Sequence, residues 1–298
     1  MDYSKIINLA FDLGFSAFEN EPLCNRTSFK IGGPADLLIE CRDIEKLPIL
    51  LAEIKANEIP LTVIGNGSNL LVSDNGIKGI VLVIVDDSVT VLGDTIKAFA
   101  GAKLSKLCNV ALENGLSGLE FGFGIPGTVG GAVYMNAGAY GGEIKQVITL
   151  VTSITRSGEI VTRSVDELEL GYRTSVFKSN FEVILSTEFK LMSAEKETIK
   201  EKMYDFLSRR KDKQPLEFPS AGSTFKRPEG HFAGALIEQC GLKGFSIGGA
   251  EVSTKHAGFV INRGNATCED VKELIKHIQE TVFNETGVKL ETEVIYLG

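Results

Sequence analysis

Residues 115–142 read GLSGLEFGFGIPGTVGGAVYMNAGAYGG, and ten of these 28 residues are glycine. Glycine tolerates positive φ and lets the backbone approach a ligand with no Cβ in between, at a cost in chain entropy. Successive backbone N–H groups in such a segment form concavities suited to phosphate groups. This long glycine loop therefore indicates either a nucleotide-binding segment or a set of tight turns between strands.

A short glycine loop, VIGNGSNLLVSDNG at 63–76, follows directly on the predicted strand LTVIG at 61–65. The Rossmann fingerprint requires three glycines between a strand and a helix. The series Gly65, Gly67 and Leu70 fails at its third member, and LLVSDNGIKG does not continue as an amphipathic helix. No GxxxxGK[ST] motif occurs. A Rossmann dehydrogenase is therefore the weaker alternative, and a P-loop enzyme is excluded.

The composition is that of an ordinary globular protein, with 298 residues, 43% of them hydrophobic and 23% charged. Lys+Arg 31 against Asp+Glu 39 gives a net charge of −8, which argues against a general nucleic-acid or anionic-membrane partner. The apolar run at 80–85 is far shorter than the ~20 residues of a spanning helix. MDYSKIINLAFDLGF shows no secretory signal. We therefore expect a cytoplasmic protein without membrane insertion.

The cysteines do not form a recognisable framework. Five are present, widely spaced and without a CxxC pair, at Cys24, Cys41, Cys108, Cys240 and Cys268. This pattern favours reduced, buried cysteines over a disulfide or metal framework, so no metal site is expected.

Helical and strand patterns are mixed along the chain. Helices are predicted at 43–58, 102–114, 193–215, 232–240 and 268–285, and strands at 61–65, 80–85, 147–156, 159–163, 182–191, 257–262 and 288–298. Asp43 is a possible cap for the first of these helices, although Pro48 makes its start ambiguous. Ser157-Gly158 between two alternating segments predicts a hairpin, and Thr267 with Asp270 resembles a capping box. A highly charged helical segment begins near 193, so we expect a domain boundary at 192–197.

Five segments carry a resemblance to a known family. GNGSNLLV at 65–72 and GFGIPGTVGGAVYMNAGAYGGE at 122–143 resemble the FAD-binding (PCMH-type) domain of the vanillyl-alcohol-oxidase-like flavoproteins. GYRTSVFK at 171–178, PSAGSTFKRP at 219–228 and LETEV at 290–294 are similar, more narrowly, to the UDP-N-acetylenolpyruvoylglucosamine reductases of bacterial cell-wall synthesis. Only 50 residues separate Arg173 from Ser223, which resembles the shorter type that lacks a tyrosine-bearing insertion.

The resemblance implies a fold and a domain order. The fold class would be α+β, with a two-lobed FAD-binding domain and a smaller C-terminal α/β substrate-binding domain. The expected ranges are 1–25 for an N-terminal helix and lead-in, 26–192 for the FAD domain (lobes 26–86 and 87–192) and 197–298 for the C-terminal domain.

The resemblance also implies a reaction, the NADPH-dependent reduction of an enolpyruvyl double bond through FAD. Hydride addition leaves an enolate-like carbon, which requires a cation at the carboxylate, a proton donor and a dry pocket. By the family pattern Arg173 is the cation, Ser223 the proton donor and Glu293 a polarising group. Spacing alone does not distinguish Glu293 from Glu291, and strand alternation places both on a solvent face.

Further residues follow from the same resemblance. The expected FAD-binding residues are Ile64, Gly65, Asn66, Gly67, Ser68, Asn69, Leu70, Gly124, Ile125, Pro126, Gly127, Thr128, Val129, Gly130, Ala132, Asn136, Ala137, Gly138 and Ala139. The expected substrate contacts are Tyr140, Arg227, Lys243 and His256. Arg227 stands where the longer type usually has asparagine, which leaves its role open.

The first histidine of the sequence is His231, so none lies in the expected flavin domain. Covalent attachment of FAD in the wider group uses a histidine there, and we therefore expect non-covalent FAD. The expected partners are NADPH and the enolpyruvyl UDP-sugar, bound by a monomer. Two alternatives stay open, a non-covalent FAD oxidase acting on a small alcohol and a non-enzymatic nucleotide sensor.

Overall fold

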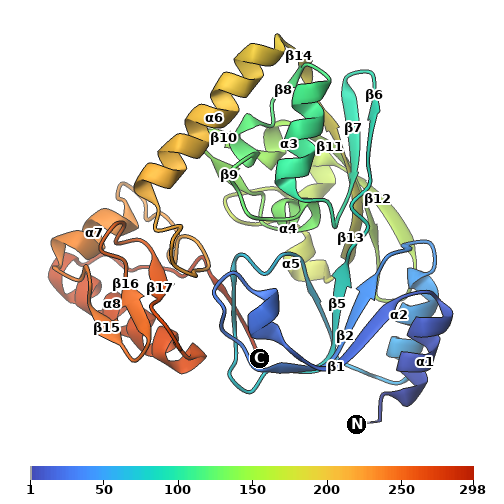
Figure 1. Ribbon diagram of the computed structural model, residues 1–298, viewed down its shortest axis with the longest axis horizontal. Helices are drawn as coiled ribbons and strands as arrows, with labels where there is room; N and C mark the ends of the chain where they lie inside the picture. Colours follow the sequence, from blue (N-terminus) through green and yellow to red (C-terminus); the bar gives the residue numbers. More distant parts are fainter. Residues whose placement is uncertain (1) are drawn as a thin grey trace. The chain divides into compact units, whose positions relative to one another are not determined.

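The computed structural model describes residues 2–298 (Figure 1). The helices are α1 (Ser4–Asp12), α2 (Leu47–Ala56), α3 (Leu104–Glu113), α4 (Val129–Tyr134), α5 (Phe177–Asn180), α6 (Lys196–Lys213), α7 (Ala233–Gln239) and α8 (Cys268–Thr286). The strands are β1 (Ser16–Pro22), β2 (Pro34–Cys41), β3 (Leu61–Ile64), β4 (Leu70–Val72), β5 (Ile77–Ile84), β6 (Val89–Leu92), β7 (Thr95–Phe99), β8 (Leu116–Ser117), β9 (Gly138–Ala139), β10 (Gly142–Glu143), β11 (Ile148–Ile154), β12 (Ile160–Ser164), β13 (Val183–Lys190), β14 (Met192–Ser193), β15 (Ser246–Ile247), β16 (Ala250–Val252), β17 (Val260–Asn262) and β18 (Ile295–Leu297). This mixture confirms the α+β class. Among the described residues, no helix has both the length and the apolar character needed to span a membrane.

The chain divides into two compact units. The first contains the chain up to Glu19, Leu37–Asn66 and Gly79–Arg209, and the second contains Asn20–Asp36, Gly67–Lys78 and Arg210–Gly298. The second unit therefore includes two early segments that the contiguous ranges expected from the sequence assign elsewhere. Its buried core shows the same grouping, because Phe29, Ile31 and Leu71 pack with residues such as Ile237 and Val271.

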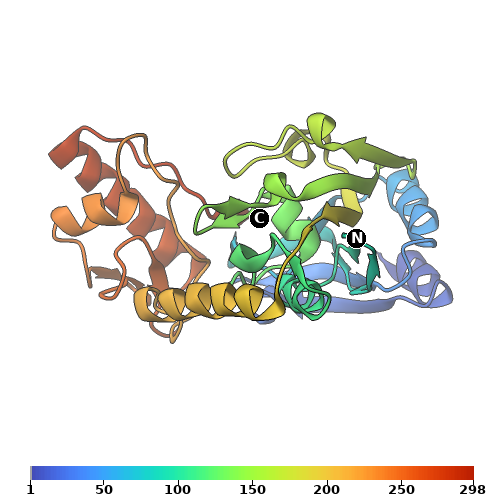
Figure 2. The same ribbon diagram turned by 90° about the horizontal axis from the view of Figure 1, so that it is seen from above.

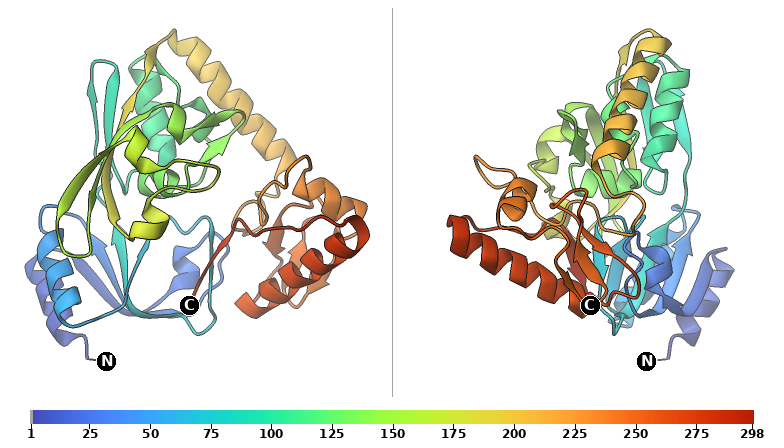
Figure 3. Two further views of the ribbon diagram at one scale, coloured as in Figure 1. Left: turned by 180° about the vertical axis from the view of Figure 1, so that it is seen from behind. Right: turned by 60° about the vertical axis from the view of Figure 1, so that its left-hand side comes forward.

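The first unit is built around an antiparallel sheet of order β12-β11-β13-β7-β6. β11 and β12 form the predicted hairpin (Figure 3, left). Its turn is closed by the Gly158 amide, which donates to Thr155 O at 3.0 Å, and Gly158 has a φ of +86°. α4 packs on β13 and β7 of this sheet, and α3 packs on α4. A further sheet of order β1-β2-β5-β3 includes the parallel pair β3–β5 that ends at the short glycine loop.

The second unit contains the antiparallel sheet β15-β16-β17, with α8 packed against β15, β16 and α7 (Figure 2). α8 begins with the predicted capping box, because Thr267 Oγ1 accepts from the Asp270 amide and Asp270 Oδ2 accepts from the Thr267 amide, both at 3.0 Å. Its expected apolar face, including Val271 and Leu274, is buried. β18 pairs in parallel with β4, so the end of the chain joins the short glycine loop.

Three sequence predictions of secondary structure, one helix and two strands, were wrong in extent. The helix expected at 43–58 covers only Leu47–Ala56, and Asp43 is not its cap but accepts from the Glu45 amide at 3.1 Å. Pro48 stands in the first turn, where a missing N–H costs nothing, so the helix starts just before it.

The strands at 288–298 and 257–262 shorten to Ile295–Leu297 and Val260–Asn262. In the second case a turn closed by the Phe259 amide and His256 O precedes the strand.

Candidate active site

The two glycine loops meet within the first unit at Gly65 and Thr128. A Cβ on Gly65 would lie 2.6 Å from Thr128 Oγ1, so only glycine allows this approach. Beside it, Asn66 Nδ2 donates to Pro126 O at 2.7 Å. Thr128 also caps α4, since its Oγ1 accepts from the Gly131 amide at 3.4 Å. Gly65 and Asn66 of the short loop therefore lie against Pro126 and Thr128 of the long loop, although the two segments are far apart in the sequence.

The long glycine loop lacks charged residues over most of its length, and most of the residues expected to bind FAD are only partly buried. Residues 122–142 contain no Asp, Glu, Lys or Arg. Of the residues expected to bind FAD, Ile64, Gly67, Val129, Gly130, Ala132 and Asn136 are buried, Asn66 and Pro126 are exposed, and the rest are half-buried. A stretch of small, partly buried residues without a carboxylate suits a flavin dinucleotide, because no acidic side chain of this stretch would repel its phosphates.

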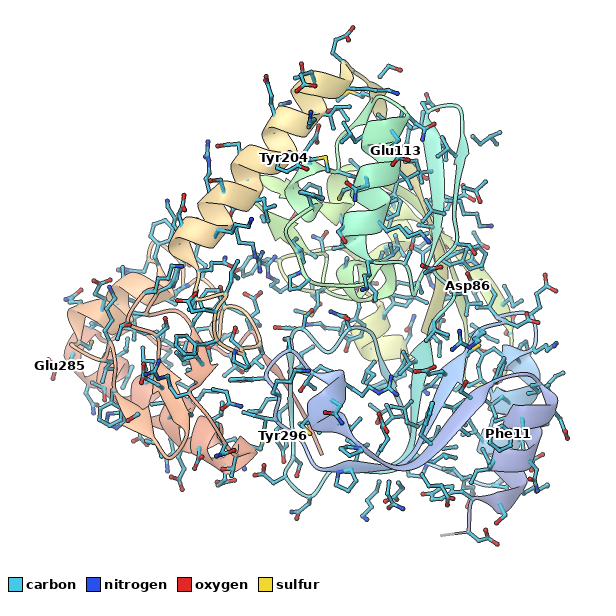
Figure 4. The ribbon with its side chains drawn as sticks, in the orientation of Figure 1. Phe11, Asp86, Glu113, Tyr204, Glu285 and Tyr296 are labelled. Atoms are coloured by element: carbon cyan, nitrogen blue, oxygen red, sulfur yellow. The ribbon has the colours of Figure 1, made fainter. Side chains whose placement is uncertain are left out.

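Tyr140 occupies the tip of the β9–β10 hairpin. Tyr140 and Gly141, with φ of 54° and 86°, link Ala139 to its partner Gly142, as in a two-residue type I′ turn. The Tyr140 ring stacks on Phe206 of α6 at 4.8 Å between centroids. The same helix carries Tyr204, labelled in Figure 4, whose ring meets the edge of Phe123 at 5.8 Å. Phe206 lies in the predicted helix at 193–215 but in none of the motifs, so this contact was not predicted.

Arg173 lies in a tight turn beside the long glycine loop. The turn is closed by two hydrogen bonds, from the Gly171 amide to Thr174 O (3.2 Å) and from the Thr174 amide to Gly171 O (3.3 Å). Arg173 has a φ of 56°, which is uncommon for a residue with a long side chain. Its Nη2 donates to Gly138 O at 3.4 Å, and its Cζ lies 5.1 Å from the Tyr172 ring centre. The structure therefore places the expected carboxylate-binding cation against the expected flavin loop.

Ser223 and Glu293 lie on neighbouring segments of the second unit. The Glu293 amide donates to Thr224 O at 2.8 Å, directly after Ser223 in the chain. Asn69 of the short glycine loop donates from Nδ2 to Glu293 O at 3.0 Å. Ser223 is half-buried and follows Gly222, whose φ is +77°. One unit thus groups the expected proton donor, the expected glutamate and part of the short loop.

The structure distinguishes the two glutamates that spacing could not. The Glu291 side chain is 73% exposed and its Oε2 lies 3.1 Å from Lys226 Nζ. Glu293 is half-buried instead of facing solvent as strand alternation suggested. The reason is that this segment is no regular strand: its bridge between Thr292 and Phe225 is isolated, and its backbone is held by Asn69 and Thr224.

The expected substrate contacts of the second unit have protein partners. His256 Nδ1 accepts from the Gly258 amide at 3.1 Å, and burial lowers the pKa of this imidazole. Lys243 pairs with Glu238 at 2.7 Å. Arg227 is exposed, with its Cζ 4.0 Å from the Phe232 ring centre.

Comparisons with known proteins agree over most of the chain. Residues 35–164 match a family model described as an FAD binding domain, and residues 214–297 match the C-terminal domain of UDP-N-acetylenolpyruvoylglucosamine reductase. The reductase of that name from Clostridium botulinum (strain Hall) is 51% identical over 280 residues, covering 94% of this chain and 92% of the relative.

The Clostridium tetani reductase is 48% identical over 295 residues, covering 98% and 96%. The crystal structure of UDP-N-acetylenolpyruvylglucosamine reductase from Thermus caldophilus superposes with a TM-score of 0.82 at 35% identity, covering 95% of this chain and 99% of that one.

Proposed function

Because the chain belongs to the family of UDP-N-acetylenolpyruvoylglucosamine reductases, we propose that Arg173, Ser223 and Glu293 carry its chemistry. Family membership makes it an oxidoreductase of peptidoglycan precursor synthesis, with FAD as cofactor and NADPH as co-substrate. The finer proposal is that it reduces the enolpyruvyl group of UDP-N-acetylglucosamine enolpyruvate to give UDP-N-acetylmuramate.

The two glycine loops would hold FAD without a covalent bond. Gly65 and Asn66 meet Thr128 and Pro126 there, and residues 122–142 of the long loop carry no charged side chain. When bound and reduced, the flavin supplies a hydride for the terminal carbon of the enolpyruvyl group. The protein then has to stabilise the negative charge that develops next to the substrate carboxylate and deliver a proton to that carbon.

One observation carries the assignment of Arg173: its guanidinium already contacts Gly138 of the long glycine loop. A permanently charged, planar guanidinium suits a carboxylate whose charge grows during the reaction, because it can bind two oxygens at once. Arg173 would therefore hold the substrate carboxylate beside the cofactor surface.

Ser223 would deliver the proton from Oγ, since an enolate carbon is basic enough to take a hydroxyl proton. Glu293, half-buried on the neighbouring segment, would polarise the substrate near the reacting carbon. Tyr140, Arg227, Lys243 and His256 would contact the remainder of the substrate. The protein would act as a cytoplasmic monomer.

Separate measurement of the two half-reactions tests this assignment. The purified protein should show an oxidised flavin spectrum that NADPH bleaches and the enolpyruvyl nucleotide restores. Ser223→Ala should keep flavin reduction by NADPH and slow substrate reduction by roughly 10²–10⁴. Arg173→Ala should slow the same half-reaction by about 10²–10³.

Ser220→Ala, in the same PSAGS segment, is the matched control and should behave as the parent protein. Equal slowing of both half-reactions by Ser223→Ala would show that Ser223 is structural. Flavin that only an alcohol bleaches would favour the oxidase alternative, and a colourless protein that binds nucleotide would favour the sensor.

A further inference from the structure

Asn136 lies in the long glycine loop, but its side chain is directed at the protein. The residue is 1% exposed and has a φ of 40°. Its Nδ2 donates to Gly171 O at 3.0 Å and to Glu143 Oε2 at 3.2 Å, and its Oδ1 accepts from the Lys145 amide at 2.9 Å. Both amide protons are therefore used, so the side chain has no donor left for a cofactor.

Gly171 is the residue whose carbonyl closes the turn around Arg173. Its oxygen accepts from the Thr174 amide as well as from Asn136, so the buried amide fixes the turn at its first residue. A second side chain holds the turn from the other end. Lys178 Nζ donates to Arg173 O at 2.6 Å, and the same ammonium lies 5.7 Å from the Tyr134 ring centre.

The backbone of Arg173 needs such support. Its positive φ is sparsely populated for a non-glycine residue and persists only when surrounding contacts hold it. A peptide flip or relaxation at this position would swing the guanidinium away from Gly138. Two independent side chains bond the carbonyls on either side of the strained position, which is the arrangement expected if the direction of the guanidinium matters.

We propose that Asn136 and Lys178 are positioning residues that set the direction of Arg173 for the substrate carboxylate, and that the Asn136 side chain does not bind the cofactor. This rests on the proposed role of Arg173. The residues act through Arg173, so their effects should vanish once its guanidinium is gone.

A double-mutant cycle tests the proposal with Asn136→Ala, Lys178→Met, Arg173→Ala and the two doubles that contain Arg173→Ala. Four quantities are measured for each variant. They are the rates of both half-reactions, the Kd of the apoprotein for FAD, the Kd of the oxidised enzyme for the enolpyruvyl nucleotide, and the melting temperature. Ser153→Ala is the control, because Ser153 is fully buried in the same unit and its Oγ donates to Glu182 at 2.6 Å, away from the turn.

We expect Asn136→Ala to slow substrate reduction on the order of 10²-fold, the scale of a misplaced reacting group, and Lys178→Met to slow it about tenfold. Flavin reduction by NADPH and the Kd for FAD should stay within twofold of the parent. In the Arg173→Ala background, adding Asn136→Ala or Lys178→Met should slow substrate reduction by less than a further twofold. Each of these changes should nevertheless lower the melting temperature by the same amount with Arg173 present and with Arg173 replaced. Ser153→Ala should lower the melting temperature only.

Additive slowing in the doubles, or a weakened Kd for FAD in Asn136→Ala, would overturn the proposal. If Asn136→Ala does not fold, the Lys178→Met variant tests the positioning role by itself, because Lys178 is only partly buried and its replacement should be tolerated. A normal rate in Arg173→Ala alone would instead refute the assigned role of Arg173. If Arg173→Ala slows substrate reduction but Asn136→Ala and Lys178→Met both react at the normal rate, the positioning role is refuted and the role of Arg173 stands.

Discussion

Replacing Gly65 by alanine tests whether the contact between the glycine loops supports cofactor binding. The backbone of Gly65 does not have a positive φ, so alanine can adopt it and the cost is steric. The new Cβ would lie 2.6 Å from Thr128 Oγ1, where ordinary contacts begin at 3.4 Å, so the loops must separate by 0.8 Å or Thr128 must rotate. Rotation of a β-branched side chain would give up its cap of α4.

The expected change in unfolding free energy has two separable contributions, one from overpacking and one from the lost helix cap. Overpacking of this kind costs about 1–3 kcal/mol of unfolding free energy. Thr128→Ala alone loses only the long 3.4 Å capping bond, about 0.5 kcal/mol. In the double variant the nearest remaining atoms to the new Cβ are the residue 128 Cβ at 3.8 Å and Gly131 Cα at 4.0 Å, which are ordinary contacts. The double variant should therefore lose about 0.5 kcal/mol, against about 1.5–3.5 kcal/mol for the sum of the singles.

Urea unfolding of the apoprotein measures the stability term, and fluorescence titration with FAD measures binding. We expect Gly65→Ala to weaken the Kd for FAD about tenfold, equivalent to about 1.4 kcal/mol, and Thr128→Ala to restore most of it in the double variant. Additive losses in the double would show that the steric contact is not the cause. Unchanged FAD binding by a destabilised Gly65→Ala would show that the cofactor does not lie across the contact.

Three further predictions concern single side chains of the two units. Glu293→Gln should slow substrate reduction at least tenfold and leave flavin reduction unchanged, while Glu291→Gln should leave both unchanged; equal effects would contradict the assignment. Burial holds the pKa of His256 below its ordinary 6.5, so the unfolded chain binds more protons and unfolding free energy should fall as pH drops from about 7.5 to about 5.5. The His256→Gln variant should lose less unfolding free energy over that pH range. An equal loss in both proteins, measured by urea titration, would show that the His256 imidazole is not the cause. Arg163→Met removes the two bonds of 2.6 and 2.7 Å that Arg163 donates to the 6% exposed Glu182 carboxylate and leaves it the bond from Ser153. This should cost about 3 kcal/mol of unfolding free energy with unchanged half-reactions; a loss below about 1 kcal/mol would refute it.

Elements with local determinants were predictable from the sequence. The β11–β12 hairpin depends on a glycine at the turn and alternation on both sides, and α8 depends on a capping box and a 3.6-residue apolar period. The exposed strand β1 gave no such signal. The strand predicted at 288–298 does contain β18, but its parallel partner β4 lies far away in the chain, so neither the pairing nor the shorter extent of β18 could be read from the local sequence.

The candidate site, too, was predictable from the sequence only in part. Motifs indicated which residues to examine, including Arg173, Ser223 and Glu293, and their catalytic roles stay predictions. No local pattern could show that Gly65 meets Thr128, or that Asn136 holds the carbonyl of Gly171. These contacts depend on how distant segments fold against one another, which spacing along the chain does not record.

The pairing of β4 with β18 has a consequence for biosynthesis. β4 ends at Val72 and its partner begins at Ile295, so a ribosome adding about 5–20 residues per second completes the pair roughly 10–45 s after the first strand emerges. Over that interval Leu71 and Val72, both almost fully buried in the finished protein, have no partner strand. The second unit, which contains both strands, therefore cannot complete its fold until the whole of the first unit has been translated.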